Sequence, residues 1–347
     1  MTPPSRHIGQ TDGPRPLRLL FWESTARCNL ACVHCRRLDP GQAQPDELTT
    51  AQVKSVLDSA ATLGMPIIVF SGGEPLMRND WQELADYARS LSLPTALATN
   101  GTLVDARIAE QIRNAGFRRV SISFDGADAA AHDAFRGVDG AFAQAMAGAA
   151  HLRAAAVPLQ VNATIAAHND QQLDEIYALA GQIGAEALHL FLLVPVGCGV
   201  QIGPSHQLPP DRYEAVLNWI VDRQQSRSME IKATCAPHYY RIAAQRGLDT
   251  GHSRGCLGGV SVVFVSHVGQ VFPCGYLPVE CGDVTQTPLA DIWRDSAVLA
   301  DLRDYDKLQG ACGRCSYKGI CGGCRARAYA ATGNYLGPEP SCKHGLG

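Results

Sequence analysis

Three closely spaced cysteines constrain this chain more than any other feature of its sequence. Cys28, Cys32 and Cys35 stand in a C-x3-C-x2-C pattern just after a short apolar run, residues 17–22. Thiolates are soft ligands that favour zinc or iron–sulfur clusters. A structural zinc site would need a fourth protein ligand, either His34 or a distant residue. Alternatively, three thiolates could hold three irons of a 4Fe–4S cluster and leave the fourth iron free to bind a ligand.

A second motif ends the next apolar run, where the chain reads Gly72-Gly73-Glu74-Pro75. The two glycines allow a ligand to approach the backbone closely, and the Glu74 carboxylate can accept hydrogen bonds from an ammonium group. The two motifs agree in their order and in their position after predicted strands. Together they resemble the radical S-adenosylmethionine (SAM) enzymes. The resemblance implies that the three cysteines bind a 4Fe–4S cluster whose open iron holds SAM, where a 5′-deoxyadenosyl radical is formed.

Apolar strand-like runs alternate with helical patterns over residues 17–225. Strands are expected over residues 17–23, 67–70, 95–99, 120–124, 159–165 and 188–194. Helices are expected after a capping box at 49–52, over 81–91, and around 109–115, 142–152, 173–183 and 213–220. Such alternation predicts parallel strands with crossover helices, in either an open doubly wound sheet or a partial barrel. The radical SAM resemblance implies an α/β fold with a partial (β/α)6 barrel and the cluster at the carboxyl ends of its strands, where α/β sheets generally carry their sites.

Further motifs of the radical SAM pattern occur at residues 98–101, 121–126 and 132–137. The SAM-binding residues implied by the resemblance are His34, Gly72, Gly73, Glu74, Asn100, Ser123 and Arg136. Of these, His34 would meet the adenine, and Gly73 and Glu74 would contact the methionine amine. Ser123 and Arg136 would reach the ribose or the carboxylate.

Each of these residues also has an ordinary structural interpretation. Asn100-Gly101 can be a simple turn, and Arg136 can form a surface ion pair. His34 departs from the aromatic residue that is usual between the last two cysteines. It can stack on the adenine, which is the interpretation favoured here, or ligate a metal.

Nine of the thirteen cysteines lie from Cys235 onward, where glycines are dense and helical periodicity fades. This region resembles the SPASM extension of radical SAM enzymes, which binds auxiliary 4Fe–4S clusters. The resemblance implies two sets of ligands: Cys312, Cys315, Cys321 and Cys342 in one, and Cys256, Cys274 and Cys324 in the other, with Cys235 or Cys281 as the candidate fourth ligand. The spacing between Cys321 and Cys324 is shorter than usual, which leaves the pairing open. One cluster with spare thiols, or a zinc ribbon, are the alternatives.

The chain is therefore expected to have three parts: a loose arm at 1–16, the radical SAM barrel at 17–230 and the SPASM-type module at 231–347. Its charge of −3 and pI near 6.4 give no reason to expect nucleic-acid binding. No apolar run reaches the length of a membrane span, about 18 residues. Because the N-terminus lacks a signal core, a cytoplasmic location is expected, and the odd cysteine count argues against a disulfide framework.

The substrate is suggested by residues 232–240, 272–277 and 321–329, which resemble the haem-forming group of radical SAM enzymes. Within that group the branch that forms haem b in the siroheme-dependent route is most similar. The resemblance implies conversion of two propionates of Fe-coproporphyrin III to vinyl groups, with an auxiliary cluster as electron acceptor and a flavodoxin or ferredoxin as electron donor. A tetrapyrrole needs cations for its propionates and an axial ligand for its iron. The candidates are His238, flanked by Tyr239 and Tyr240, and the arginines Arg27, Arg36, Arg37, Arg325 and Arg327.

Three other functions remain open from the sequence. One is haem d1 synthesis from a siroheme derivative, and another is the peptide or protein maturation for which SPASM extensions are often used. The third is a non-catalytic iron–sulfur carrier or zinc module. Glu74 and its two glycines disfavour this last reading, since a carrier needs no SAM site.

Overall fold

The computed structural model describes residues 15–37, 47–225, 228–249 and 254–345. A single sheet of ten strands runs through these residues in the order β10-β9-β8-β1-β2-β3-β4-β5-β6-β7. The strands are β1 Leu19–Glu23, β2 Ile67–Ser71, β3 Thr95–Thr99, β4 Arg119–Ser123, β5 Leu159–Ile165, β6 Ala187–Leu192, β7 Glu230–Thr234, β8 Val262–Val265, β9 Gln270–Phe272 and β10 Gly282–Asp283. All pairs from β8 through β1 to β7 are parallel, whereas β9 pairs antiparallel with both β8 and β10.

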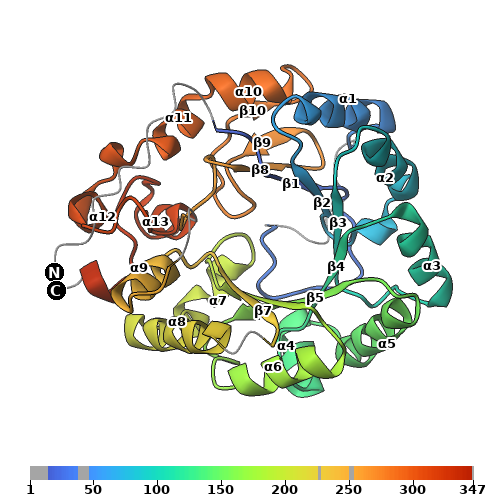
Figure 1. The fold of residues 1–347 in the computed structure, drawn as a ribbon, viewed down its shortest axis with the longest axis horizontal. Coiled ribbons are helices and arrows are strands. Elements are labelled where there is room, and N and C mark those ends of the chain that lie inside the picture. Colours follow the sequence, from blue (N-terminus) through green and yellow to red (C-terminus); the bar gives the residue numbers. More distant parts are fainter. Residues whose placement is uncertain (1–14, 38–46, 226–227, 250–253, 346–347) are drawn as a thin grey trace.

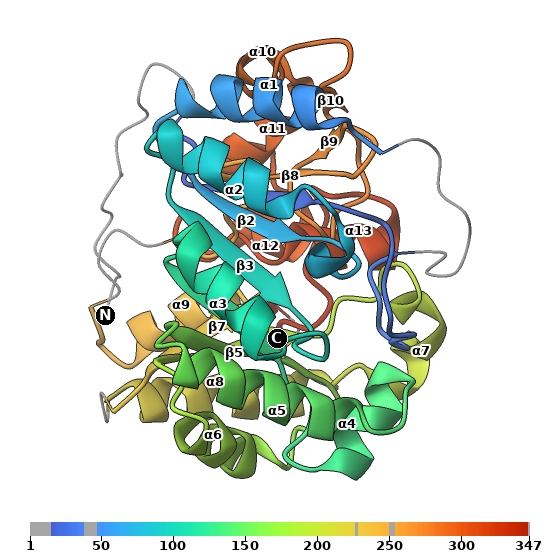
Figure 2. The same cartoon turned by 90° about the vertical axis from the view of Figure 1, so that its right-hand side faces the viewer.

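The parallel strands form an arc, and most helices lie on its outer side (Figure 1). The helices are α1 Thr50–Ala61, α2 Trp81–Ser90, α3 Ala106–Ala115, α4 Ala129–Arg136, α5 Ala141–Ala154, α6 Leu173–Gln182, α7 Gly199–His206, α8 Pro210–Gln225, α9 His238–Gln245, α10 Leu289–Asp295, α11 Ala297–Arg303, α12 Gly310–Arg314 and α13 Arg325–Thr332. Helices α1, α2, α3 and α5 follow one another along the outer side of the sheet, as Figure 2 shows. Helices α9, α12 and α13 lie across the ring from β2, β3 and β4 (Figure 1), whereas α10 packs beside α1. The predicted partial (β/α)6 barrel is confirmed.

The structure differs from the sequence prediction at both ends of this arc. Strand β7 adds to the outer edge of β6, and β8 pairs in parallel with β1, Leu19 lying opposite Val262. Neither strand was predicted. Residues 230–234 mix charged, apolar and polar side chains, and the short apolar run 262–265 lies in a region where only a metal-bound module was expected. The expected boundary at 230/231 falls within β7, so the division into two domains stays a prediction. The predicted arm at 1–16 lies almost wholly outside the described residues.

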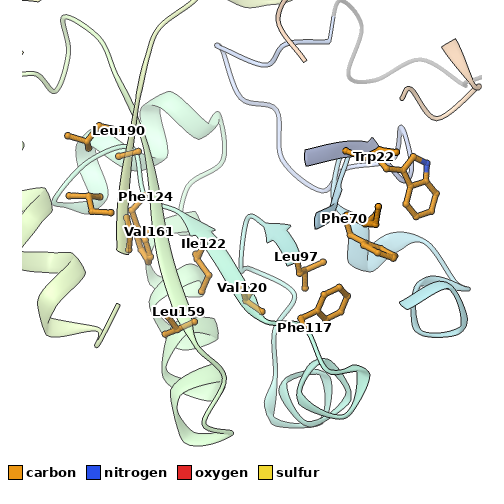
Figure 3. Packing of buried hydrophobic residues seen from close by; sticks show 14 of the residues in the cluster. Trp22, Phe70, Leu97, Phe117, Val120, Ile122, Phe124, Leu159, Val161 and Leu190 are labelled. Carbon is orange, nitrogen blue, oxygen red and sulfur yellow. The ribbon is translucent and has the colours of Figure 1, made fainter. Parts of the chain in front are cut away.

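The main core fills the layer between the sheet and its outer helices (Figure 3). Trp22, Phe70 and Phe117 meet edge to face in it, with ring centroids 5.2 and 5.4 Å apart. Successive side chains of a strand point to opposite faces, so the residues between these core positions face the inside of the arc. On β5 the core residues Leu159 and Val161 alternate with polar ones such as Asn162. The inside of the arc is therefore available to polar ligands.

Helix α1 begins where the capping box was predicted. The backbone N–H of Gln52 donates to Thr49 Oγ1, and the N–H of Thr49 donates to Gln52 Oε1. This exchange satisfies two backbone donors that a helix start otherwise leaves without partners. Among the described residues, no helix combines the length and apolar character needed to cross a membrane.

Trp293 tests how α10 is attached to the sheet. It is 1% exposed, its Nε1 donates to the Arg15 carbonyl at 3.1 Å, and the Arg303 guanidinium lies 4.3 Å from its ring. We expect Trp293→Ala to lower the free energy of unfolding by about 3–5 kcal/mol, because it leaves a large cavity. Anaerobic denaturant unfolding would measure this.

Leu103→Ala is the matched control, since Leu103 is 39% exposed. We expect it to change stability by less than about 0.5 kcal/mol. Equal losses for the two variants would contradict the assigned core.

Candidate functional site

The three N-terminal cysteines lie in the loop that follows β1, and backbone hydrogen bonds fix this loop from two sides. On one side the N–H groups of Gly73 and Glu74 donate to the carbonyls of Thr25 and Arg27, at 2.8 and 2.7 Å. On the other side the loop N–H groups of Ala31 and Val33 donate to the carbonyls of Arg136 and Phe135, at the end of α4. The Gly-Gly-Glu-Pro motif thus holds the cysteine loop in place.

Gly73 allows the two loops to approach each other. A Cβ atom at this position would lie 2.1 Å from the Arg27 carbonyl oxygen, so no other residue fits. The sequence suggested that the glycines make room for a ligand. At Gly73 the structure shows that the space is needed by the backbone of the cysteine loop itself.

The sulfur atoms in this loop have N–H donors directed at them. Leu30 N donates to Cys28 Sγ at 3.5 Å, and Arg136 Nη1 donates to Cys32 Sγ at 3.7 Å. Burial raises the pKa of Cys28 to about 11 and also raises that of Cys32. Without a bound cation these buried thiols would stay protonated. The hydrogen-bond donors and the buried position of these sulfur atoms therefore agree with thiolates whose negative charge is balanced by an iron–sulfur cluster.

Glu74 is fully buried at the carboxyl ends of β2 and β3. Its Oε1 accepts hydrogen bonds from Thr99 Oγ1 and Leu76 N, and its Oε2 accepts one from Asn100 N at 2.8 Å. Burial raises its pKa to about 7, and these three donors limit the rise. An ammonium group at this carboxylate would further stabilise its anionic form.

Asp125 contacts two of the predicted SAM-binding residues. Arg136 Nη2 lies 2.6 Å from Asp125 Oδ2, and His34 Nε2 lies 3.4 Å from the same oxygen. Burial is the largest influence and would raise the pKa of Asp125, but nearby positive groups, chiefly Arg136, and a backbone hydrogen bond together lower it. The His34 ring stacks on Phe135 at 4.0 Å, and burial lowers its pKa to about 4. His34 is therefore a neutral stacking group in this arrangement.

The remaining predicted SAM residues lie at the same edge of the sheet. Asn100 follows β3, and its Nδ2 donates to Asn29 Oδ1 in the cysteine loop at 2.9 Å. Ser123 is the last residue of β4 and is half-buried. Gly72 has a φ of 149° and packs against the backbone of residues 24–25. The structure thus brings all seven residues to the strand ends around the cysteine loop; their contacts with SAM stay a prediction.

The C-terminal cysteines also carry directed donors. Cys312 Sγ accepts hydrogen bonds from Glu339 N and Arg325 Nη2, at 3.4 and 3.6 Å. Tyr317 N donates to Cys315 Sγ, and Gly323 N donates to Cys321 Sγ. All thirteen cysteines are described and free of disulfides. In the described part of the chain no three His, Cys, Asp or Glu side chains converge on a single metal ion. A multi-iron cluster, by contrast, takes one thiolate per iron.

The predicted substrate-binding residues near these cysteines already have protein partners. Arg325 donates to the carbonyls of Tyr335 and Gly337, at 3.1 and 2.7 Å. Arg327 is 1% exposed and pairs with Glu339 Oε2 at 3.1 Å. These guanidinium groups hold the C-terminal segment together, and their contact with propionates is an untested prediction.

His238 and its neighbours lie in the same region. The His238 ring is 1% exposed, lies edge to face with Tyr213, and has its Nε2 3.9 Å from Glu339 Oε2. Burial lowers its pKa to about 4. The Tyr239 hydroxyl donates to Gln224, and the Tyr239 and Tyr240 rings meet edge to face at 5.2 Å. Their contact with substrate is likewise untested.

The cysteine loop carries the other arginines. Arg36 Nη2 pairs with Glu23 Oε1 at 2.5 Å, and its guanidinium lies 4.0 Å above the Phe264 ring. Arg37 donates to the Ala26 carbonyl, and Arg27 is exposed. Arg36 thus lies between the cysteine loop and β8.

Sequence reasoning missed two buried carboxylates. Glu23 accepts a hydrogen bond from His267 Nδ1 at 2.6 Å and also pairs with Arg36. Glu339 accepts one from Cys324 N at 2.8 Å, while its own N–H donates to Cys312. Glu23 could have been noticed as a charge at the end of an apolar strand. Glu339 stands between two prolines outside any motif, so only the fold reveals it.

Comparison with known proteins identifies the class. The family model described as Radical SAM superfamily matches residues 22–180, and the model described as Iron-sulfur cluster-binding domain, SPASM, matches residues 256–316. The chain belongs to the radical SAM superfamily and carries a SPASM domain. It is an enzyme of this class, with SAM and 4Fe–4S clusters as cofactors. The zinc and electron-carrier alternatives are therefore set aside.

Among curated proteins, the chain is 46% identical to the AdoMet-dependent heme synthase of Methanosarcina barkeri, over 96% of this chain and 98% of that protein. It is 45% identical to the AdoMet-dependent heme synthase of Oleidesulfovibrio alaskensis, over 96% and 89%. The pre-heme d1 synthase of Dinoroseobacter shibae is 32% identical, over 97% and 91%.

Among solved structures, anSMEcpe with bound AdoMet has a TM-score of 0.71 at 19% identity, covering 92% of this chain and 94% of that one. At this level of identity the likeness concerns the fold alone.

Gly73→Ala tests the clamp on the cysteine loop. The added Cβ would collide with the Arg27 carbonyl, so the loop must shift. We expect SAM cleavage, measured as 5′-deoxyadenosine from dithionite-reduced protein, to fall by about 100-fold, because a displacement of about 1 Å is enough for such a loss.

Gly181→Ala is the control, since a Cβ there has no atom within 4 Å. Gly181 lies in helix α6, and we expect the Gly181→Ala enzyme to cleave SAM as the unmodified enzyme does. A Gly73→Ala protein with full cleavage would remove the clamp from the mechanism.

Proposed function

We propose that this enzyme forms haem b from Fe-coproporphyrin III by oxidative decarboxylation of two propionate side chains. The observation that carries the proposal is its similarity to AdoMet-dependent heme synthases, which extends over nearly the full length of both proteins. The similarity covers 96% of this chain, and the chain itself carries the cysteine loop after β1 and nine further cysteines from Cys235 onward.

The chemistry is balanced for each propionate separately. The side chain loses one hydrogen atom, one CO2 and one electron, and becomes a vinyl group. When bound, SAM and the clusters supply the hydrogen-abstracting radical and an acceptor for the released electron. The protein binds, orients and excludes water, and needs no side-chain base for hydrogen removal.

The residues around the cysteine loop serve this binding. Glu74 holds the methionine ammonium of SAM, because its buried carboxylate lies at the carboxyl ends of β2 and β3. Arg136 and Asp125 lie together beside Cys32 and position the remaining polar groups of SAM. The stacked rings of His34 and Phe135 offer a flat apolar surface at the adenine position.

Arg36 is the best-supported contact for a substrate propionate. It follows Cys35 directly and lies against Phe264 of β8, so it stands between the cysteine loop and the C-terminal segment. Its guanidinium can bind a carboxylate in a bidentate manner. The Glu23 carboxylate already neutralises the charge of Arg36. A substrate carboxylate must therefore compete with Glu23 for this guanidinium.

Two further features of the proposal concern the cell. A flavodoxin or ferredoxin would deliver the electron that starts each turnover. The enzyme would work in the cytoplasm, where cysteine thiols stay reduced.

Haem d1 synthesis from a siroheme derivative is the second candidate. The similarity to a pre-heme d1 synthase favours it. That similarity also extends over nearly the full length, but the sequence identity is lower than to the heme synthases. Peptide maturation is favoured less strongly: the mycofactocin maturase MftC of Mycobacterium tuberculosis is 30% identical over 94% of this chain and 83% of that protein.

The deciding experiment is anaerobic. The reconstituted, reduced enzyme is given SAM with Fe-coproporphyrin III, and the porphyrin products are followed by mass. Loss of two CO2 with formation of haem b is expected. Abundant 5′-deoxyadenosine with an unchanged porphyrin would contradict the proposal and direct the search to siroheme derivatives, then to peptides.

Cysteine variants separate radical formation from the complete reaction. Cys28→Ala is expected to abolish SAM cleavage, because it removes a ligand of the SAM-binding cluster. Cys324→Ala is expected to retain part of the SAM cleavage but to form no haem b, because the electron released with CO2 loses its acceptor. Full turnover by the Cys324→Ala enzyme would exclude an auxiliary cluster from the reaction.

A further inference from the structure

The set formed by Cys256, Cys274 and Cys324 lacks an assigned fourth ligand. We propose that Cys235 supplies the fourth thiolate to this auxiliary cluster and that Cys281 does not take part. This inference rests on the iron–sulfur content of the proposed enzyme and not on the identity of its substrate.

Cys235 is placed by the barrel, outside the region that the SPASM model matches. It comes directly after β7, the strand that extends the sheet beyond β6. Its backbone is left-handed, with a φ of 55°, a conformation that is strained for a non-glycine residue. The surrounding structure maintains it: Arg327 Nη2 and the Tyr213 hydroxyl both donate to the Cys235 carbonyl, at 3.1 and 3.2 Å. Such a strained position indicates that the direction of this side chain matters.

The neighbours of Cys235 are the other members of the set. Cys235, Cys274 and Cys324 pack into one small apolar cluster around Leu277 and Ala326. The thiols whose charges act on the Cys235 thiol are those of Cys324, Cys274 and Cys256, so these four thiols lie near one another. This is the environment that a 4Fe–4S cluster with four cysteine ligands requires.

Cys281 has different surroundings. Its Sγ lies 3.7 Å from the Val279 carbonyl oxygen, to which it can donate a weak hydrogen bond. It packs against the main core of the barrel rather than with Leu277 and Ala326. Burial raises its pKa to about 12, and the other groups that act on it are Ser296, Arg303 and Glu280. Cys281 is therefore a buried structural cysteine.

Arg327 balances the charge of the proposed four-thiolate set. Its guanidinium is buried and holds both the Cys235 carbonyl and the Glu339 carboxylate, and Glu339 in turn accepts the N–H of Cys324. One buried cation thus supports two of the four ligands, Cys235 from the barrel and Cys324 from the C-terminal segment.

Complete ligation has a mechanistic consequence. A cluster with four thiolates has no open iron, so the substrate cannot coordinate to it. This auxiliary cluster would then accept the electron without bonding to the porphyrin. A three-cysteine cluster would instead offer a binding position to substrate.

The test compares Cys235→Ala with Cys281→Ala in a background that carries Cys28→Ala, Cys32→Ala and Cys35→Ala. This background removes the SAM-binding cluster, so iron and sulfide per chain report the auxiliary clusters only. After anaerobic reconstitution, Cys235→Ala is expected to lose about four irons or, if three thiolates retain a cluster, to show a changed EPR spectrum in the reduced state. Cys281→Ala is expected to match the background in both measurements.

Unchanged iron and an unchanged EPR spectrum in Cys235→Ala would overturn the inference, and so would loss of iron in Cys281→Ala. Folding is checked with Cys235→Ala alone, which should keep the SAM-binding cluster and cleave SAM. A wild-type enzyme that makes no haem b would contradict the proposed function but leave this iron count unaffected, so the two failures are distinguishable.

Discussion

The backbone clamp between the cysteine loop and the Gly-Gly-Glu-Pro motif is the interaction on which the site depends. Two hydrogen bonds, from Gly73 to Thr25 and from Glu74 to Arg27, join the loops that follow β1 and β2. The same backbone stretch that holds the cysteines also places the Glu74 carboxylate. The three cysteines and the Glu74 carboxylate therefore keep a fixed relation, and neither can move without the other. Orientation of this kind is the main contribution that the protein makes to a cofactor reaction.

Each cysteine set is accompanied by a buried arginine. Arg136 donates to Cys32 and pairs with Asp125, and Arg325 donates to Cys312. Arg327 pairs with Glu339 beside Cys324. Removing one partner of a buried ion pair costs about 3–5 kcal/mol, because the other charge is left uncompensated. The sequence predicted that Arg325 and Arg327 bind substrate propionates. In the structure, both side chains stabilise the segment that carries the C-terminal cysteines.

The fold of the first two-thirds of the chain could be predicted from the sequence, because its strands and helices carry clear periodicity and helix signals such as the capping box at Thr49. The cysteine loop and Glu74 could also be found, since they form a motif. The role of Gly73 could not, because it depends on how closely two loops approach. Strand β8 is a short apolar run, but its pairing with β1 joins segments that lie far apart in the sequence. Glu339 belongs to no local motif, so its contacts could not be predicted either.

The position of β1 between β2 and β8 sets an order for assembly. Leu19 pairs with Ile67, a neighbour along the chain, and with Val262, which is synthesised much later. Contacts between distant residues form more slowly than local ones. During synthesis, the N-terminal cysteine loop can therefore be built on β1 and β2 while one edge of β1 is still uncovered. Until β8 arrives, that exposed edge is the place where the nascent chain is most open to pairing with another molecule.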